Sequence, residues 1–92
     1  MLSVCPPITW NDESEEHIAG HNVLPHEVEE VVYTHPRLKK RGRDDTTLFY
    51  GQSNAGRYLF IVTDEALDGG MYIVTARDMT NAERREFLKK AR

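Results

Sequence analysis

The apolar residues of this 92-residue chain change their spacing at residues 35–36. Before this point, Val28, Val31 and Val32 recur at helical spacing, which is typical of a helix with one buried face. After it, three runs rich in β-branched and aromatic residues are separated by short turn segments. These runs are residues 46–50, 57–63 and 71–76. Short connections join antiparallel strands, so the chain is predicted to fold as an α+β domain.

Local signals mark the ends of three helices. Asn11 is a favourable N-cap, Asn22 can adopt the left-handed conformation that ends a helix, and Pro25 suits the first position of the next helix. Thr80 and Glu83 have the spacing of a capping box, which opens a third helix. This last helix is expected to turn three residues inward, namely Phe87, Leu88 and Ala91.

The strand pattern predicts the order of the sheet. The continuously apolar residues 59–62 indicate a central strand that is covered on much of both faces. Residues 8–10 are expected to form a short first strand or an extended lead-in, and residues 38–41 are a candidate for an additional strand. The expected architecture is an antiparallel sheet of about four strands with two N-terminal helices and one C-terminal helix, in a single domain over residues 1–92.

The composition excludes several classes of protein. With 39% hydrophobic and 29% charged residues, the chain has no run of the ~18 apolar residues that a membrane span needs, and its start lacks the pattern of a secretory signal. The single cysteine, Cys5, excludes an intramolecular disulfide, which favours a cytoplasmic location. The chain also lacks a phosphate-binding glycine loop, a nucleophile elbow and a CxxC pair, so no cofactor and no metal are expected.

The charges are divided along the chain. The first 36 residues contain seven carboxylates and no Lys or Arg, whereas the remaining residues contain all twelve cations against eight carboxylates. Five of these cations lie within residues 37–43. A cationic face can attract polyanions even on a protein with a net charge of -3. We therefore expect Lys39, Lys40, Arg41 and Arg43 to bind RNA, the alternative being an edge strand protected from aggregation by its own charges.

Two further arginines stand at the ends of strand-like runs. Strand periodicity places Arg57 on the face of Leu59, and Arg77 on the face of Ile73. Because the chain reverses between the two strands, both arginines are expected at the same end of the sheet, bordering one cleft. Guanidinium groups are suited to bidentate contact with a phosphate and to stabilising its developing charge. For either arginine alone, an ion pair with a carboxylate such as Asp78 is the favoured alternative.

The histidines supply a candidate base. The ordinary pKa of histidine, about 6.5, suits proton abstraction at neutral pH, and His21 is the first candidate for this role. The alternative is a residue that caps the end of its helix. His17 and Glu13 share a helix face with His21 at a spacing that could hold a metal ion, but no further ligand is evident and we do not expect a metal site.

Tyrosines lie between the cations and could stack on unpaired bases. Tyr58 is the one we assign as an accessory site residue. Tyr50 and Tyr72 are the other members of this group, and at least two of the three are expected to pack in the core instead.

The order of several motifs resembles the BrnT family of toxins. The opening segments are residues 8–11 (ITWN), 16–23 (EHIAGHNV) and 25–31 (PHEVEEV), and the later ones are 56–59 (GRYL), 73–80 (IVTARDMT) and 83–84 (ER). The similarity spans about residues 8 to 88. Asn22 replaces the glycine that usually follows the histidine in this family, and asparagine tolerates the same backbone conformation.

The resemblance implies a RelE-like fold and a metal-independent endoribonuclease, the toxin of a type II toxin–antitoxin pair that inhibits translation. It also implies a neutralising antitoxin of the BrnA type with a ribbon-helix-helix part. By position, His21, Arg57 and Arg77 correspond to family signature residues. In the mechanism that we expect, His21 takes the proton of a ribose 2′-hydroxyl, both arginines hold the phosphate, and Glu83 orients a cation.

Two other classes of function fit the same sequence. One is a non-catalytic module of RelE-like fold that binds RNA or an acidic protein without cleaving it. The other is a self-associating protein, a homodimer for example, in which the acidic helices of one copy meet the basic strands of another.

Overall fold

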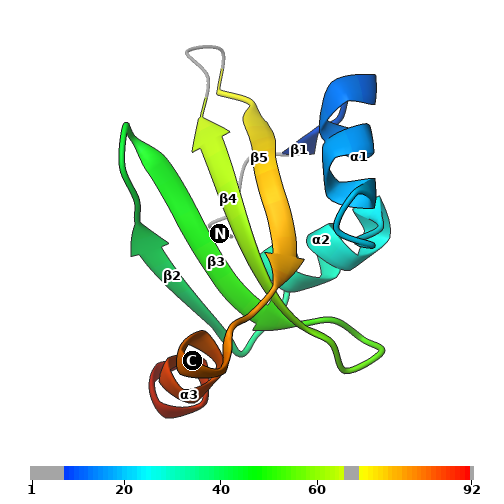
Figure 1. The fold of residues 1–92 in the computed structure, drawn as a ribbon. Coiled ribbons are helices and arrows are strands. Elements are labelled where there is room, and N and C mark those ends of the chain that lie inside the picture. The colour runs from blue at the N-terminus through cyan, green and yellow to red at the C-terminus, as the bar shows by residue number, and fades with distance from the viewer. Residues whose placement is uncertain (1–7, 66–68, 92) are drawn as a thin grey trace.

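The computed structural model describes residues 8–65 and 69–91, so Cys5 lies outside the described residues. Eight elements follow one another in the order strand, helix, helix, four strands, helix (Figure 1). They are β1 (Ile8–Thr9), α1 (Asp12–Ala19), α2 (Pro25–Tyr33), β2 (Arg37–Arg41), β3 (Thr46–Gln52), β4 (Tyr58–Glu65), β5 (Met71–Asp78) and α3 (Asn81–Lys90). The expected α+β class and the number and order of the helices are confirmed.

Helix boundaries lie where the capping signals predict them. Asn11 Oδ1 accepts a hydrogen bond from the Ser14 amide at 2.8 Å, and Asn22 has a φ of 61° after the end of α1. At the start of α3, Thr80 Oγ1 accepts from the Glu83 amide at 3.1 Å, while Glu83 Oε1 accepts from the Thr80 amide at 2.8 Å. These bonds satisfy amides that a helix leaves without partners in its first turn.

The sheet differs from the expected one in strand number and direction. Its order is β1-β5-β4-β3-β2, with β4 central as predicted. Residues 37–41 form a full strand, so the sheet has five strands rather than about four. The sheet is also mixed, because β1 pairs with β5 in parallel. The long segment between β1 and β5 allows this direction, which the short turns of the other strands do not.

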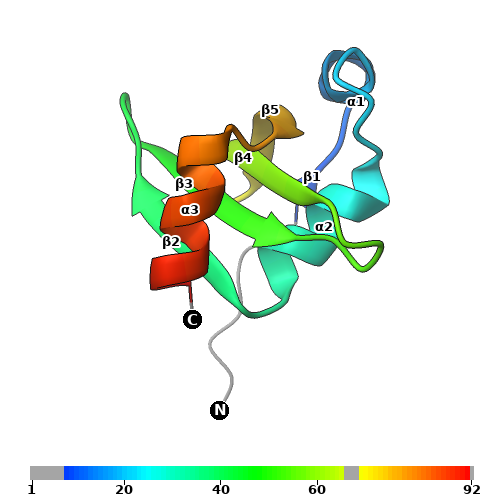
Figure 2. The same ribbon diagram turned by 60° about the horizontal axis from the view of Figure 1, so that its bottom comes forward.

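Helices cover the two faces of the sheet unequally (Figure 2). The face beneath α1 and α2 is closed: Leu59 and Ile61 of β4 and Val28 of α2 are completely buried. The close contact between α2 and β3 needs a glycine in β3, because a Cβ atom on Gly51 would lie 2.9 Å from Cγ1 of Val31. We call this the helical-hairpin face, and the opposite one the α3 face.

The α3 face is closed less completely. Its cluster consists of Tyr50, Phe60 and Phe87, with partly buried side chains such as Leu48 and Val62 around them. The expectation that Leu88 faces inward is wrong, because its side chain is 63% exposed. Phe87 is the one buried residue of α3, so this helix is held by a much smaller apolar contact than α2.

A register shift in the sheet decides where Arg77 points. Thr63 pairs with Ile73 and Val62 pairs with Thr75, so Val74 is inserted between two pairs. One inserted residue exchanges the faces of every later side chain in the strand. Arg77 is therefore opposite Phe60, on the α3 face, instead of sharing the face of Ile73 as strand periodicity predicted.

No helix in the described ranges 8–65 and 69–91 is long and apolar enough to cross a membrane.

Candidate functional site

Arg57 joins three segments on the helical-hairpin face. Its Nη1 donates to the Asn22 carbonyl at 2.7 Å and to Glu27 Oε1 at 2.9 Å, and its Nη2 donates to Asp78 Oδ1 at 3.0 Å. Glu27 is buried, with 7% of its surface exposed, and its Oε1 also accepts from the Leu24 amide at 3.1 Å. The guanidinium thus connects the end of α1, the start of α2 and the end of β5. The alternative of an ion pair with Asp78 is what the structure shows.

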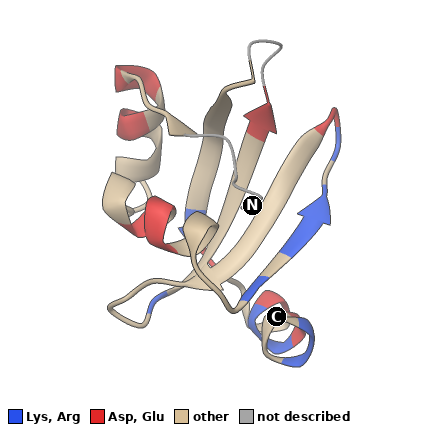
Figure 3. Cartoon of the chain, turned by 180° about the vertical axis from the view of Figure 1, so that it is seen from behind, with Lys and Arg blue, Asp and Glu red and all other residues tan. Residues whose placement is uncertain are grey.

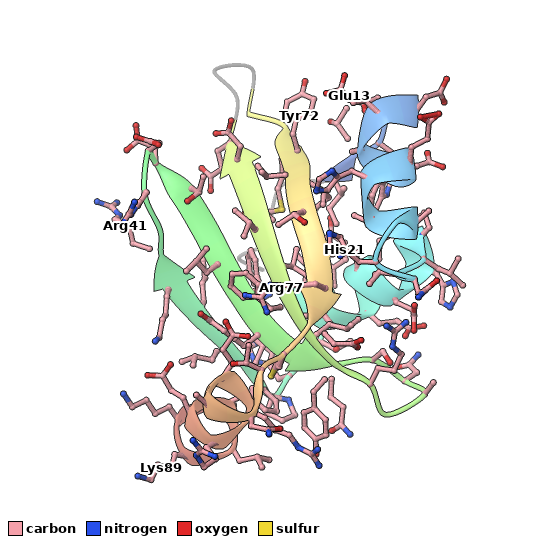
Figure 4. The ribbon with its side chains drawn as sticks, viewed as in Figure 1. Glu13, His21, Arg41, Tyr72, Arg77 and Lys89 are labelled. Carbon is pink, nitrogen blue, oxygen red and sulfur yellow. The ribbon has the colours of Figure 1, made fainter. Side chains whose placement is uncertain are left out.

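Arg77 is engaged on the other face of the sheet. Its Nη1 and Nη2 donate to the two carboxylate oxygens of Glu83 at 2.8 and 3.0 Å, and its guanidinium lies over the Phe60 ring at 4.3 Å. These hydrogen bonds hold the pKa of the Glu83 carboxyl below its ordinary value. Figure 4 shows Arg77 lying across the sheet rather than toward α1.

The expectation of one cleft bordered by Arg57 and Arg77 is therefore wrong. Directly opposed residues of antiparallel strands point to the same face, so Arg77 shares the face of Phe60, and Asp78 shares the face of Leu59. The inserted Val74 is the physical cause, because without it Arg77 would point toward the helical hairpin. Each guanidinium also carries its own carboxylate partner.

His21 stays apart from Arg77. It lies in the turn after α1 and is exposed, and its ring meets the ring of His17 edge to face at 5.6 Å. Nε2 of His17 lies 3.1 Å from Oγ1 of Thr75. Within the described part of the chain, no hydrogen bond links the His21 ring to either arginine. The three residues predicted as catalytic are thus not brought together in one site.

The cations of β2 divide into paired and unpaired groups. Lys40 forms an ion pair with Glu86 at 2.5 Å, and the amine of Lys39 lies over the Phe49 ring at 5.7 Å. Arg41 and Arg43 stand at the β2–β3 turn, without an ion pair to any residue that the structure describes. Beside them is a shallow hollow of about 400 Å³, lined by Lys39, Lys40, Arg41, Thr47 and Glu65.

Sequence reasoning did not single out the cations of α3. Arg85 and Lys89 are exposed on this helix and have no carboxylate partner among the described residues. Figure 3 shows Lys and Arg on β2 and α3, and Asp and Glu on α1 and α2 as well as at the β2–β3 turn and the end of β4. Helical spacing relative to the inward Phe87 would have placed both residues on the outer side. We call Arg41, Arg43, Arg85 and Lys89 the cationic rim, which consists of one pair at the β2–β3 turn and a second pair on α3 near the other end of β2 (Figure 4).

The tyrosines of the α3 face serve packing. The guanidinium of Arg84 lies over the ring of Tyr58 at 4.1 Å, and the ring of Phe87 meets the Tyr58 ring edge to face with centroids 5.9 Å apart. Tyr50 is buried against Phe60, with ring centroids 5.0 Å apart, and burial raises the pKa of its phenol. The guanidinium of Arg84 therefore covers the Tyr58 ring where a base could stack.

A cluster of charged groups gathers under α3. Lys40 from β2 and Arg77 from β5 meet Glu86 and Glu83 of α3, with Tyr50 of β3 beneath them. We call these five residues the α3 cluster. Glu86 also accepts a hydrogen bond from Lys90 of α3 at 3.2 Å.

Neither a metal site nor a relative identifies the chain. Among the described residues, no group of three or more His, Cys, Asp or Glu side chains could hold a metal ion. A scan against protein-family models finds no match, and searches of the curated proteins and of the solved structures find none either. Function must therefore be inferred from the residues and their geometry.

Proposed function

We propose that the protein is the toxin of a type II toxin–antitoxin pair and that it acts on RNA in the cytoplasm. The ordered motifs shared with the BrnT toxins support this assignment, and the α+β architecture is compatible with the RelE-like fold that they imply. The same resemblance supports a ribbon-helix-helix antitoxin as the partner. A reading frame for such a protein beside this gene would support the pairing.

The observation that best supports RNA as the target is the cationic rim. Arg41 and Arg43 of the β2–β3 turn, and Arg85 and Lys89 of α3, form no ion pair with a described carboxylate, although Asp45 and Glu65 line a hollow with Arg41. The acidic helices α1 and α2 lie apart from these elements (Figure 3). Unpaired cations of this kind bind phosphates and release counterions, which gives affinity without sequence preference. The rim, rather than the predicted three-residue site, supports binding best.

Binding of a fluorescent single-stranded RNA across a salt series tests this proposal. If about four phosphates contact the rim, the logarithm of the association constant should fall with the logarithm of salt concentration with a slope of about -3. An association that does not depend on salt, or no association at 50 mM salt, would rule out the rim as an RNA-binding surface.

Removal of rim charges should weaken RNA binding through the loss of individual phosphate contacts. The double variant Arg41→Gln/Arg43→Gln is expected to bind the RNA about tenfold more weakly and to show a slope smaller by about 1.4, since each lost phosphate contact removes about 0.7. Adding Glu16→Lys on α1 restores the net charge without restoring the rim. Recovery of affinity in this triple variant would mean that net charge, and not the rim, controls binding.

RNA cleavage is the second candidate, favoured by the α3 cluster. Arg77 and Lys40 could hold the scissile phosphate while the 2′-oxygen attacks phosphorus, a cyclic phosphate forms, and the 5′-oxygen leaves. Glu83 would take the 2′-hydroxyl proton, and Lys40 would supply one to the leaving oxygen. In the arrangement described, Glu83 neutralises Arg77, so cleavage requires these two groups to separate.

Binding without cleavage is the third outcome, and the ion pairs favour it. Both arginines of the predicted catalytic set are held by carboxylates on opposite faces of the sheet. A toxin relative that has lost catalysis would keep the rim and show salt-dependent RNA binding without a product.

A further inference from the structure

The α3 cluster has the composition of an anion site that is already filled. Two cations project from the sheet, and both meet carboxylates from a single helix: Glu83 accepts two parallel hydrogen bonds from Arg77, and Glu86 accepts one from Lys40 at 2.5 Å. A guanidinium binds a phosphate through the same parallel pair of hydrogen bonds that it makes to a carboxylate. Glu83 therefore occupies the position that a phosphate would take on Arg77.

Movement of α3 alone would vacate both cations. Glu83 and Glu86 are three residues apart on one helix, hence on neighbouring positions of its surface, and no other element supplies a carboxylate to Arg77 or Lys40 among the residues described. Phe60 supports the Arg77 guanidinium from below at 4.3 Å, and Tyr50 lies under Lys40 at 5.6 Å. These rings belong to the sheet, so the cations would keep their support if the helix moved.

The attachment of α3 is weak compared with that of α2. Phe87 is its one buried side chain, whereas three valines of α2 are 0–1% exposed. The two ion pairs are partly open to solvent, with 31% of the Glu86 side chain and 35% of the Arg77 side chain exposed. The single-contact Lys40–Glu86 pair is of a kind that contributes little in water, whereas the two parallel hydrogen bonds make Arg77–Glu83 the stronger pair. A phosphate offers Arg77 the same parallel geometry and can therefore compete for it.

We propose that Arg77 and Lys40 form a binding site for a backbone phosphate of RNA, which α3 fills with the carboxylates of Glu83 and Glu86 until RNA displaces them. The identity of the ligand as RNA rests on the proposed function. The site itself does not, because it should bind inorganic phosphate.

The double variant Glu83→Gln/Glu86→Gln tests the site. Glutamine at position 83 keeps an oxygen that can accept from the Thr80 amide, so the cap of α3 is preserved while the charge is lost. We expect this variant to bind inorganic phosphate about tenfold more tightly than the wild type at constant ionic strength, measured by NMR titration of the backbone amides near Arg77. Adding Arg77→Gln should abolish the gain.

A matched control separates this effect from a general change in charge. Glu13→Gln/Glu16→Gln removes the same charge from α1, whose exposed carboxylates make no hydrogen bond to a described residue. Its phosphate affinity should equal that of the wild type. Equal affinities in the two double variants would overturn the proposal.

Hydrogen exchange of the wild-type protein provides a second test that does not depend on a variant. The amides of α3 should exchange faster when RNA is bound, because the helix loses its two ion pairs to the sheet. Bound RNA with unchanged exchange in α3 would refute the displacement while leaving the proposed function intact. A phosphate gain in the Glu83→Gln/Glu86→Gln variant without RNA binding would support the anion site and refute RNA as the target.

Discussion

Replacement of Arg57 with alanine should lower the free energy of unfolding by about 3 kcal/mol. The variant leaves the buried Glu27 carboxylate without its cation and removes the hydrogen bond to the Asn22 carbonyl. An uncompensated charge in a buried position is costly, because water cannot solvate it. Urea unfolding followed by circular dichroism measures the loss.

A double-mutant cycle identifies the source of this effect. If Glu27 is the partner that matters, Arg57→Ala in a Glu27→Gln background should cost much less than Arg57→Ala alone, because the neutral amide needs no cation. Glutamine can still accept from the Leu24 amide. Unchanged stability of Arg57→Ala together with loss of RNA cleavage would show instead that Arg57 contacts the substrate.

If the protein cleaves RNA, Arg77→Ala should lower the rate constant by about 10²- to 10³-fold. Arg77 is the only guanidinium in the α3 cluster, and no other group there can supply two parallel donors to a phosphate. The measurement is a single-turnover time course with end-labelled RNA, with the cyclic phosphate product resolved on a gel.

Two variants serve as controls for this effect. Arg85→Ala removes the same charge from an exposed position of α3 and should change the rate by only a fewfold, through weaker binding. Arg77→Lys keeps the charge but loses the two parallel N–H donors of the guanidinium. Its rate should therefore lie between those of the alanine variant and the wild type. Equal rates in Arg77→Ala and the wild type would exclude the α3 cluster as the cleavage site.

The helix ends were predicted well because they depend on contacts between residues that are close in the sequence. Asn11, Thr80 and Glu83 make the capping hydrogen bonds that their spacing implies, and Asn22 adopts the left-handed conformation. Each of these outcomes depends on side chains within a few residues of the backbone groups that they satisfy. The apolar run at residues 59–62 likewise lies in the central strand.

The candidate site was predicted less well because its geometry depends on pairing between distant segments. Strand periodicity assumes an uninterrupted ladder, and nothing in residues 71–76 marks Val74 as an insertion. Because of this insertion, the Arg77 side chain lies on the α3 face, where it pairs with Glu83. The ion pair between Lys40 and Glu86 could not be predicted either, because the two residues are far apart in the sequence.

Sequence alone determined the α+β class, the helix ends and the separation of acidic from basic residues, since these follow from composition and from contacts between near neighbours. Tertiary structure decided which cations remain available to a ligand. An arginine that a carboxylate already holds can bind a phosphate only by displacing that carboxylate. The inserted residue in β5 and the docking of α3 determine which cations are held in this way, through contacts between remote parts of the chain.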